Sequence, residues 1–128
     1  NKHPMAFYRD WAKSRTIHSC LALYNQEDGD DVIVAGGIIC RQRPETAKGF
    51  VFLTLEDETG MANVIIKPKL FEIYRDLVVT GSLIQVYGLL QLDQGVCNVI
   101  ARHFELLPPL PSTSSLSDGV YLPARNFH

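Results

Sequence analysis

One stretch of the chain predicts a strand that ends in a tight turn: Lys48-Gly-Phe-Val-Phe-Leu-Thr-Leu-Glu-Asp-Glu-Thr-Gly60. Residues 50–56 are apolar or β-favouring, a run of the length of one strand. Residues 57–60 have the composition of a turn, in which Gly60 can adopt a positive φ. Because Met61-Ala-Asn-Val-Ile-Ile66 is a second strand-like run, the two runs together predict a β-hairpin.

The alternation of side chains within this hairpin predicts two different faces. Side chains that are two residues apart in a strand point to the same face of the sheet. The aliphatic side chains share one face, which is the expected core: Val51, Leu53, Leu55, Ala62, Val64 and Ile66.

The opposite face carries Phe50, Phe52 and Thr54, with Asn63 and Ile65 in the partner strand. Aromatic rings beside small hydrogen-bonding groups suit the stacking and edge recognition of unpaired bases. The alternative is that protein covers both faces, which would make the two phenylalanines ordinary core residues. The pattern alone leaves both interpretations open.

The rest of the chain predicts three more strands and one helix. A strand over 32–43 is interrupted by Gly36 and Gly37, which indicate a bulge or a sharp bend. A helix is expected over 68–79, and strands over 82–92 and 96–106 form a second hairpin. The order β-β-β-α-β-β predicts a mainly β protein, a five-stranded oligonucleotide/oligosaccharide-binding (OB) barrel.

Three segments follow from this assignment. Residues 1–29 predict a short N-terminal helical extension, with Pro4 at a first helical position and Ser19 as a possible cap of a second turn. Residues 30–107 form the OB domain. Residues 108–128 are rich in proline and serine and predict a linker with an irregular C-terminal tail. Since the first residue is Asn rather than Met, we expect the chain to be a piece of a longer protein.

Composition excludes several classes of function. The formal charge of −2 argues against strong non-specific binding of duplex nucleic acid. The three cysteines are widely spaced and predict reduced thiols in a cytoplasmic protein. The four histidines lack the spacing of metal ligands, so neither a metal nor another cofactor is expected. No apolar run predicts a signal peptide or a membrane span.

The usual ligand surface of an OB barrel is the face of its second and third strands, with the loops after its first and fourth strands. Basic residues flank this face, and a basic rim around aromatic rings fits a single strand whose phosphates contact cations while its bases stack. For each cation, the alternative is a solvated loop charge. The candidate nucleic-acid-binding residues are therefore Arg41, Arg43, Lys48, Phe50, Phe52, Thr54, Asn63, Lys67 and Lys69.

One motif that ends at Gly60 closely resembles the C-terminal region of bacterial error-prone DNA polymerases: R-Q-R-P-x-T-A-K-G-x-V-F-x-T-L-E-D-E-T-G. These are DnaE-type, C-family translesion polymerases. The resemblance continues through 62–71, to His3-Pro4 and to 124–128, and so covers nearly the whole chain. One departure is Lys67, where the family commonly has Trp; at this position charge would replace stacking.

This resemblance implies a domain that holds the unpaired template strand for a polymerase acting in translesion synthesis, DNA repair and DNA replication. The catalytic carboxylates of such a polymerase would lie outside this chain, so this part of the protein is expected not to be an enzyme. The expected partners are single-stranded DNA and the upstream domains of the same polymerase, but no membrane.

The hairpin also resembles, more weakly, the anticodon-binding barrel of class II aspartyl-type tRNA synthetases. That resemblance implies that Phe52 stacks on a base and that Asn63 reads one. Two alternatives to template binding stay open: a barrel that docks replication partners such as the sliding clamp or mutasome accessory proteins, and a barrel that binds RNA.

Overall fold

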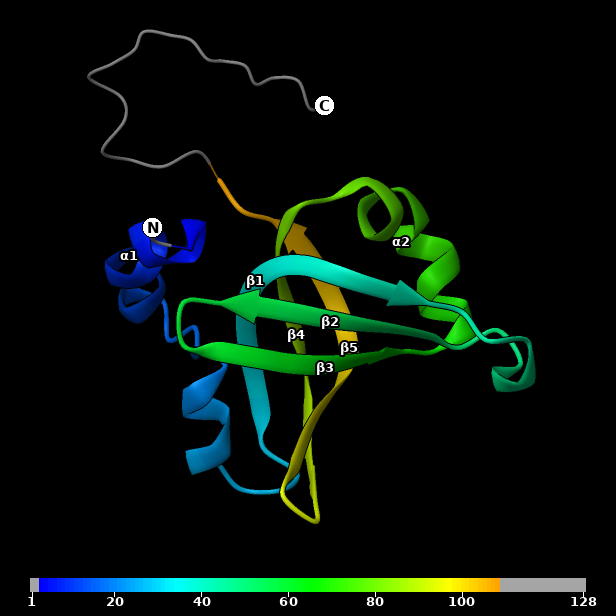
Figure 1. Cartoon of the computed structure of the whole chain (residues 1–128), viewed down its shortest axis with the longest axis horizontal. Coiled ribbons are helices and arrows are strands. Elements are labelled where there is room, and N and C mark those ends of the chain that lie inside the picture. The colour runs from blue at the N-terminus through cyan, green and yellow to red at the C-terminus, as the bar shows by residue number, and fades with distance from the viewer. Residues whose placement is uncertain (1–2, 109–128) are drawn as a thin grey trace, which may run out of the picture.

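One long bent strand and two hairpins close into a barrel in the computed structural model, which describes residues 3–108 (Figure 1). The strands are β1 (Asp31–Gln42), β2 (Val51–Asp57), β3 (Gly60–Ile66), β4 (Leu83–Asp93) and β5 (Val96–Leu106). Their order around the barrel is β1-β2-β3-β5-β4, in which β3 and β5 are parallel and the other neighbours are antiparallel. The predicted five-stranded OB barrel is confirmed. The linker and C-terminal tail predicted for residues 108–128 lie outside the described residues from residue 109 onward.

The two glycines of β1 mark the point where this strand changes partner. Gly37 pairs with Leu83 of β4 and with Glu56 of β2, and the register shifts just beyond it. A Cβ atom on Gly36 would lie 2.8 Å from the carbonyl oxygen of Glu56. Glycine is therefore required for the close approach of β1 and β2, and the predicted bend is confirmed.

The inner face of the barrel is aliphatic, and one end is closed by a helix. The buried side chains of the first hairpin are the predicted ones: Val51, Leu53, Leu55, Ala62, Val64 and Ile66. Helix α2 (Pro68–Thr80) buries Phe71 and Val78 against the barrel. Tyr74, where α2 departs from helical geometry, contacts Phe104 of β5 edge to face at 5.2 Å between ring centroids.

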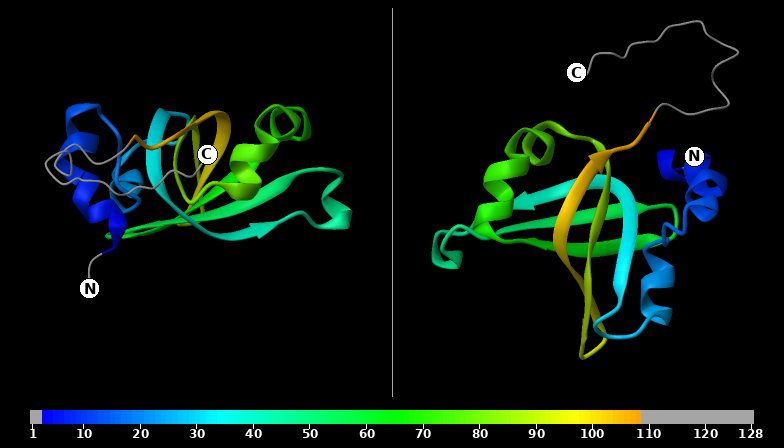
Figure 2. Two further views of the ribbon diagram at one scale, coloured as in Figure 1. Left: turned by 90° about the horizontal axis from the view of Figure 1, so that it is seen from above. Right: turned by 180° about the vertical axis from the view of Figure 1, so that it is seen from behind.

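The N-terminal segment packs on the barrel itself. It consists of η1 (Pro4–Tyr8), α1 (Arg9–Ser14) and η2 (Leu21–Asn25). Buried Met5, Tyr8 and Ala12 form a second apolar cluster with Ala35 of β1. Figure 2 shows that these helices and α2 lie at opposite ends of the barrel. The helical character predicted for this segment is confirmed, in the form of three short helices.

Between residues 3 and 108, no helix is long and apolar enough to span a membrane. Over the same residues, no group of three or more His, Cys, Asp or Glu side chains is arranged to hold a metal ion.

Candidate nucleic-acid interface

The outward faces of β2 and β3 carry the mixture of side chains that the alternation predicts. Phe52 pairs with Ile65, and Thr54 pairs with Asn63. Phe52 and Thr54 are half-buried and Asn63 is exposed, whereas the residues between them are buried. Phe50, just before β2, is also half-buried. The predicted orientation of the hairpin is therefore correct, with the Phe52 ring outside the core.

One neighbouring strand, β5, extends this face with residues that were not predicted. The parallel pairing of β3 and β5 places Asn98 beside Asn63, and Ile100 beside Ile65. A polar row and an apolar row thus cross β2, β3 and β5 side by side. The alternation of β5 shows that Asn98 and Ile100 share a face. Their position beside β3 depends on a long-range parallel pairing that local sequence does not reveal.

The loop between β1 and β2, which contains η3 (Glu45–Ala47), projects beyond the barrel at the end where α2 lies (Figures 1 and 2). Lys48 and Gly49 both have positive φ, at 55° and 92°. A Cβ atom on Gly49 would lie 3.2 Å from Cγ of Pro68, so the base of the loop packs against the first turn of α2. This contact brings the chain segments of Lys48 and Lys67 together at one end of the face.

The structure gives the two predicted arginines specific partners near α2. Nε of Arg41 donates to the carbonyl oxygen of Val78, and Nη2 to that of Gly81, both at 2.7 Å. Arg41 therefore satisfies carbonyl groups at the C-terminal end of α2 rather than facing Phe52. The guanidinium of Arg43 stacks over the ring of Phe71 at 5.0 Å.

The three predicted lysines are exposed and have no ion-pair partner among residues 3–108. Lys67 and Lys69 line a hollow of about 410 Å³ between α2 and β4–β5, together with Arg102, which was not predicted. Arg102 also pairs with Asp31 at 3.1 Å, but both side chains are well exposed, so this pair contributes little. Ile100 belongs both to this hollow and to the outer face of β3 and β5.

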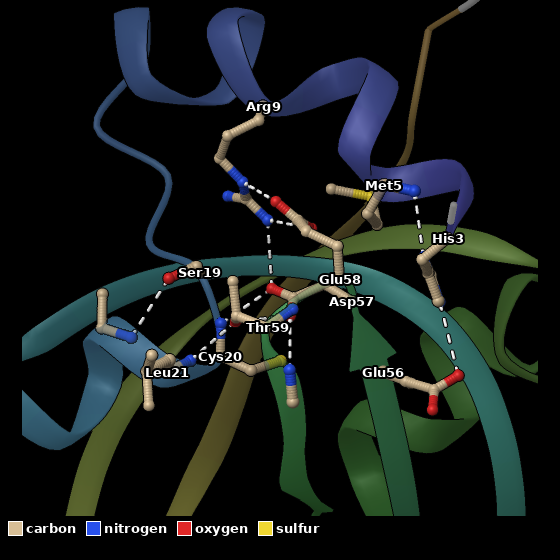
Figure 3. Close-up of polar contacts among 12 residues, drawn as sticks. His3, Met5, Arg9, Ser19, Cys20, Leu21, Glu56, Asp57, Glu58 and Thr59 are labelled. Atoms are coloured by element: carbon tan, nitrogen blue, oxygen red, sulfur yellow. Dashed lines mark hydrogen bonds and ion pairs between the residues drawn. The ribbon is translucent and has the colours of Figure 1, made fainter. Parts of the chain in front are cut away.

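The turn of the β2–β3 hairpin is bound to the N-terminal segment through the buried carboxylate of Asp57 (Figure 3). Oδ2 of Asp57 accepts from the Cys20 N–H at 2.8 Å and from Nη2 of Arg9 at 3.1 Å. Oδ1 accepts from the N–H and the hydroxyl of Thr59, and from the Gly60 N–H. Both carboxylate oxygens are thus satisfied, and they join two segments that are far apart in the sequence.

These contacts determine the protonation of Asp57. Burial alone would raise the pKa of this carboxyl group. The hydrogen bonds from Cys20 and Thr59, together with the charge of Arg9, outweigh burial and hold the pKa below its ordinary value of 3.8. Asp57 is therefore ionised at neutral pH and acts as an acceptor for all of its donors.

Two neighbouring acids add to this attachment. Arg9 makes a bidentate pair with Glu58, at 2.5 and 2.8 Å, which lowers the pKa of Glu58. Nε2 of His3 lies 3.5 Å from Oε1 of Glu56. The sequence places Glu58 in a turn and Glu56 at the end of a strand, but it assigns neither acid a role. We name this set of contacts between residues 3–22 and 56–60 the N-terminal clasp.

Comparison with known proteins agrees with this geometry. Residues 32–107 match the family model described as the OB-fold nucleic acid binding domain. The chain is 38% identical to error-prone DNA polymerase 2 of Rhizobium meliloti, over 95% of this chain and 11% of that protein. It is also 38% identical to the error-prone DNA polymerase of Caulobacter vibrioides, over 98% of this chain and 13% of that protein. The resemblance found in the sequence is confirmed, and the chain spans only about an eighth of these relatives.

Solved structures show the same fold at low sequence identity. Asparaginyl-tRNA synthetase from Pyrococcus horikoshii superposes with a TM-score of 0.60 at 20% identity, over 71% of this chain and 23% of that chain. The protein ygiW of E. coli superposes with a TM-score of 0.55 at 15% identity, over 73% of this chain and 92% of that chain. At these identities the similarity establishes the fold alone.

Proposed function

Because the chain belongs to the OB-fold nucleic acid binding domain family, we propose that the outer face of β2 and β3 binds single-stranded DNA. The observation that carries this proposal is the mixture of half-buried and exposed side chains on that face, with Phe52 in an apolar row beside the polar pair Thr54 and Asn63. If this face were buried in the protein's own core, Thr54 and Asn63 would lose their contact with water at a cost in free energy. An aromatic ring beside amide and hydroxyl groups suits unpaired bases.

Each part of the face has a chemical role in this proposal. Phe52, with Phe50 just before β2, stacks on bases, which contributes about 1–3 kcal/mol per base. Thr54 and Asn63 hydrogen-bond to base edges or sugars. Lys48, Lys67 and Lys69 contact phosphates from the end of the barrel at which the β1–β2 loop and α2 meet.

The similarity to error-prone DNA polymerases over nearly the whole chain suggests the context of this binding. We propose that the domain holds the unpaired template strand for a polymerase that acts in translesion synthesis and DNA repair in the cytoplasm. In this role the domain binds without catalysing a reaction and needs no cofactor. Its partners are then single-stranded DNA and the other domains of the polymerase.

Replacing Phe52 with alanine tests the proposal. We expect the Kd for a fluorescein-labelled dT oligonucleotide, measured by anisotropy at low salt, to rise roughly 5- to 150-fold, because about 1–3 kcal/mol of stacking is lost. The matched control is Ile73→Ala, which removes an exposed apolar side chain from α2 (73% exposed) and should leave Kd unchanged. The proposal fails if the wild type does not bind, or if Phe52→Ala binds as tightly as the wild type.

The phosphate contacts predict a defined response to salt. In the Lys67→Ala variant, we expect the slope of log K against log salt concentration to become shallower by about 0.7, the value for one contact to single-stranded nucleic acid. Arg41→Ala is the matched control, because this guanidinium is already bound to carbonyl groups of α2. Equal slopes for the wild type and Lys67→Ala would show that Lys67 does not contact a phosphate.

One observation favours a second candidate function, the docking of a protein partner. Ile73, Leu89 and Ile100 form an apolar lining in the hollow beside α2, edged by Lys67, Lys69 and Arg102. Such a groove could accept a segment of the sliding clamp or of a mutasome accessory protein. If Ile73→Ala weakens the capture of a purified clamp or accessory protein and Phe52→Ala does not, this alternative replaces DNA binding. Tighter binding of RNA than of DNA of equal sequence would instead favour the anticodon-type function.

A further inference from the structure

The outer face of β3 has a hollow at the end that lies nearer the N-terminal segment. It has a volume of about 600 Å³, within the range of about 300–1,000 Å³ that is typical of small-ligand sites. Its lining combines the polar pair of the DNA-binding face with side chains from η2 and β3: Leu21, Tyr24, Thr54, Met61 and Asn63. The hollow is therefore a continuation of the proposed interface.

Three large apolar side chains around this hollow are exposed. Tyr24 is 49% exposed, Leu21 is 60% exposed and Met61 is 55% exposed. A group of exposed apolar side chains around a hollow indicates a binding surface, whereas single exposed residues need no explanation. Because the polar groups in this hollow are neutral, it suits a flat uncharged ligand with hydrogen-bonding edges.

The N-terminal clasp holds Tyr24 beside the face. The Cys20 N–H binds Asp57, and the Leu21 N–H donates to Oγ1 of Thr59 at 3.0 Å (Figure 3). The Ala22 N–H donates to the hydroxyl of Ser19 at 3.1 Å, which begins η2. The first residues of η2 are thus bonded to the turn of the hairpin that carries Phe52, and this arrangement reduces the entropy lost on binding.

We propose that this hollow binds one unpaired base of the DNA strand, with Tyr24 as a second stacking residue and Thr54 and Asn63 at the edge of the base. The inference rests on the proposed function and extends it to a second base. Outward side chains two residues apart in a strand are separated by roughly 7 Å. Phe52 and the Thr54–Asn63 pair are therefore one such step apart and can serve neighbouring bases.

The distribution of charge indicates at which end of the face the phosphates of the strand lie. The lysines lie at the α2 end, whereas Glu56, Asp57 and Glu58 lie at the turn beside η2. Phosphates are attracted to the first end, whereas at the second end three carboxylates face the single guanidinium of Arg9, which pairs with two of them. A base carries no charge and can enter the hollow while its phosphates remain nearer the lysines.

A cycle of protein variants and DNA variants tests this site. The probe is labelled dT8, intact or with a single abasic residue at each position in turn, and Kd is measured by anisotropy. We expect Tyr24→Ala to weaken binding of intact dT8 roughly fivefold or more, and Tyr24→Phe to bind like the wild type. We also expect the wild type to lose affinity when one particular base is removed, and Tyr24→Ala to be insensitive to that removal, because two partners of one contact are non-additive.

The matched control is Phe7→Ala, which removes an aromatic ring from the same N-terminal segment (63% exposed) but outside the hollow. Thermal melts establish that each variant is folded. If Phe52→Ala weakens binding while Tyr24→Ala does not, the hollow is not a base site and the proposed function stands. If Tyr24→Phe loses as much affinity as Tyr24→Ala, stacking on Tyr24 is wrong. If intact dT8 does not bind the wild type, the proposed function itself fails.

Discussion

Asp57→Ala is expected to lower the free energy of unfolding by about 2–5 kcal/mol at pH 7, because several donors around this buried carboxylate lose their acceptor, at about 1–3 kcal/mol for each buried donor. The variant leaves the N–H groups of Cys20 and Thr59, and one contact of Arg9, without their acceptor. Buried donors without a partner are costly. Urea unfolding followed by circular dichroism measures the loss. The control Asp76→Ala removes an exposed carboxylate of α2 and should change stability by less than about 0.5 kcal/mol.

The same residue predicts how stability depends on pH. Since the folded pKa of Asp57 lies below its ordinary value of 3.8, its stabilisation is complete well above that value and is lost as the pH falls through the folded pKa. We therefore expect the stability difference between the wild type and Asp57→Asn to be large at pH 7 and to shrink below about pH 4. A difference that is constant from pH 7 to pH 2.5 would contradict the assigned role of this carboxylate.

Phe104→Ala is expected to cost about 3–5 kcal/mol of stability, the usual range for removing a phenylalanine from a core. Phe104 is buried in the barrel and packs against Tyr74 of α2, so its loss leaves a cavity between the helix and the sheet. Phe52→Ala, on the outer face, should be much less destabilising because its ring is only half-buried. Equal losses of stability in the two variants would show that the ring of Phe52 belongs to the core.

This pair of phenylalanines also shows how much the sequence could predict. Alternation within a strand depends only on local geometry, so the orientation of Phe52 relative to Val51 and Leu53 could be read directly. The order of elements and the glycines of β1 were sufficient for the OB barrel, because bends and hairpins leave local signals. Regular elements and their faces were thus accessible without coordinates.

Contacts between distant segments were not accessible in this way. A basic residue next to a predicted face looks the same in the sequence whether it has no ion-pair partner among residues 3–108, like Lys67, or is bound to the end of a helix, like Arg41. The four consecutive residues 57–60 are typical of a turn, and nothing in them indicates that Asp57 also binds Cys20 and Arg9. For the same reason, nothing in the local sequence around Tyr24 indicates that this residue lines a hollow together with Asn63.

The short pairing between β3 and β5 has a consequence for self-association. Within the described strands these two pair only over Asn63–Ile65, so residues 60–62 form a stretch of sheet edge. Such an edge can recruit a strand from another molecule. Helix η2 is held next to this stretch by the bond from Leu21 to Thr59. We therefore expect a barrel prepared without residues 3–25 to form edge-to-edge dimers more readily than the whole chain, because this segment lies beside the unpaired stretch.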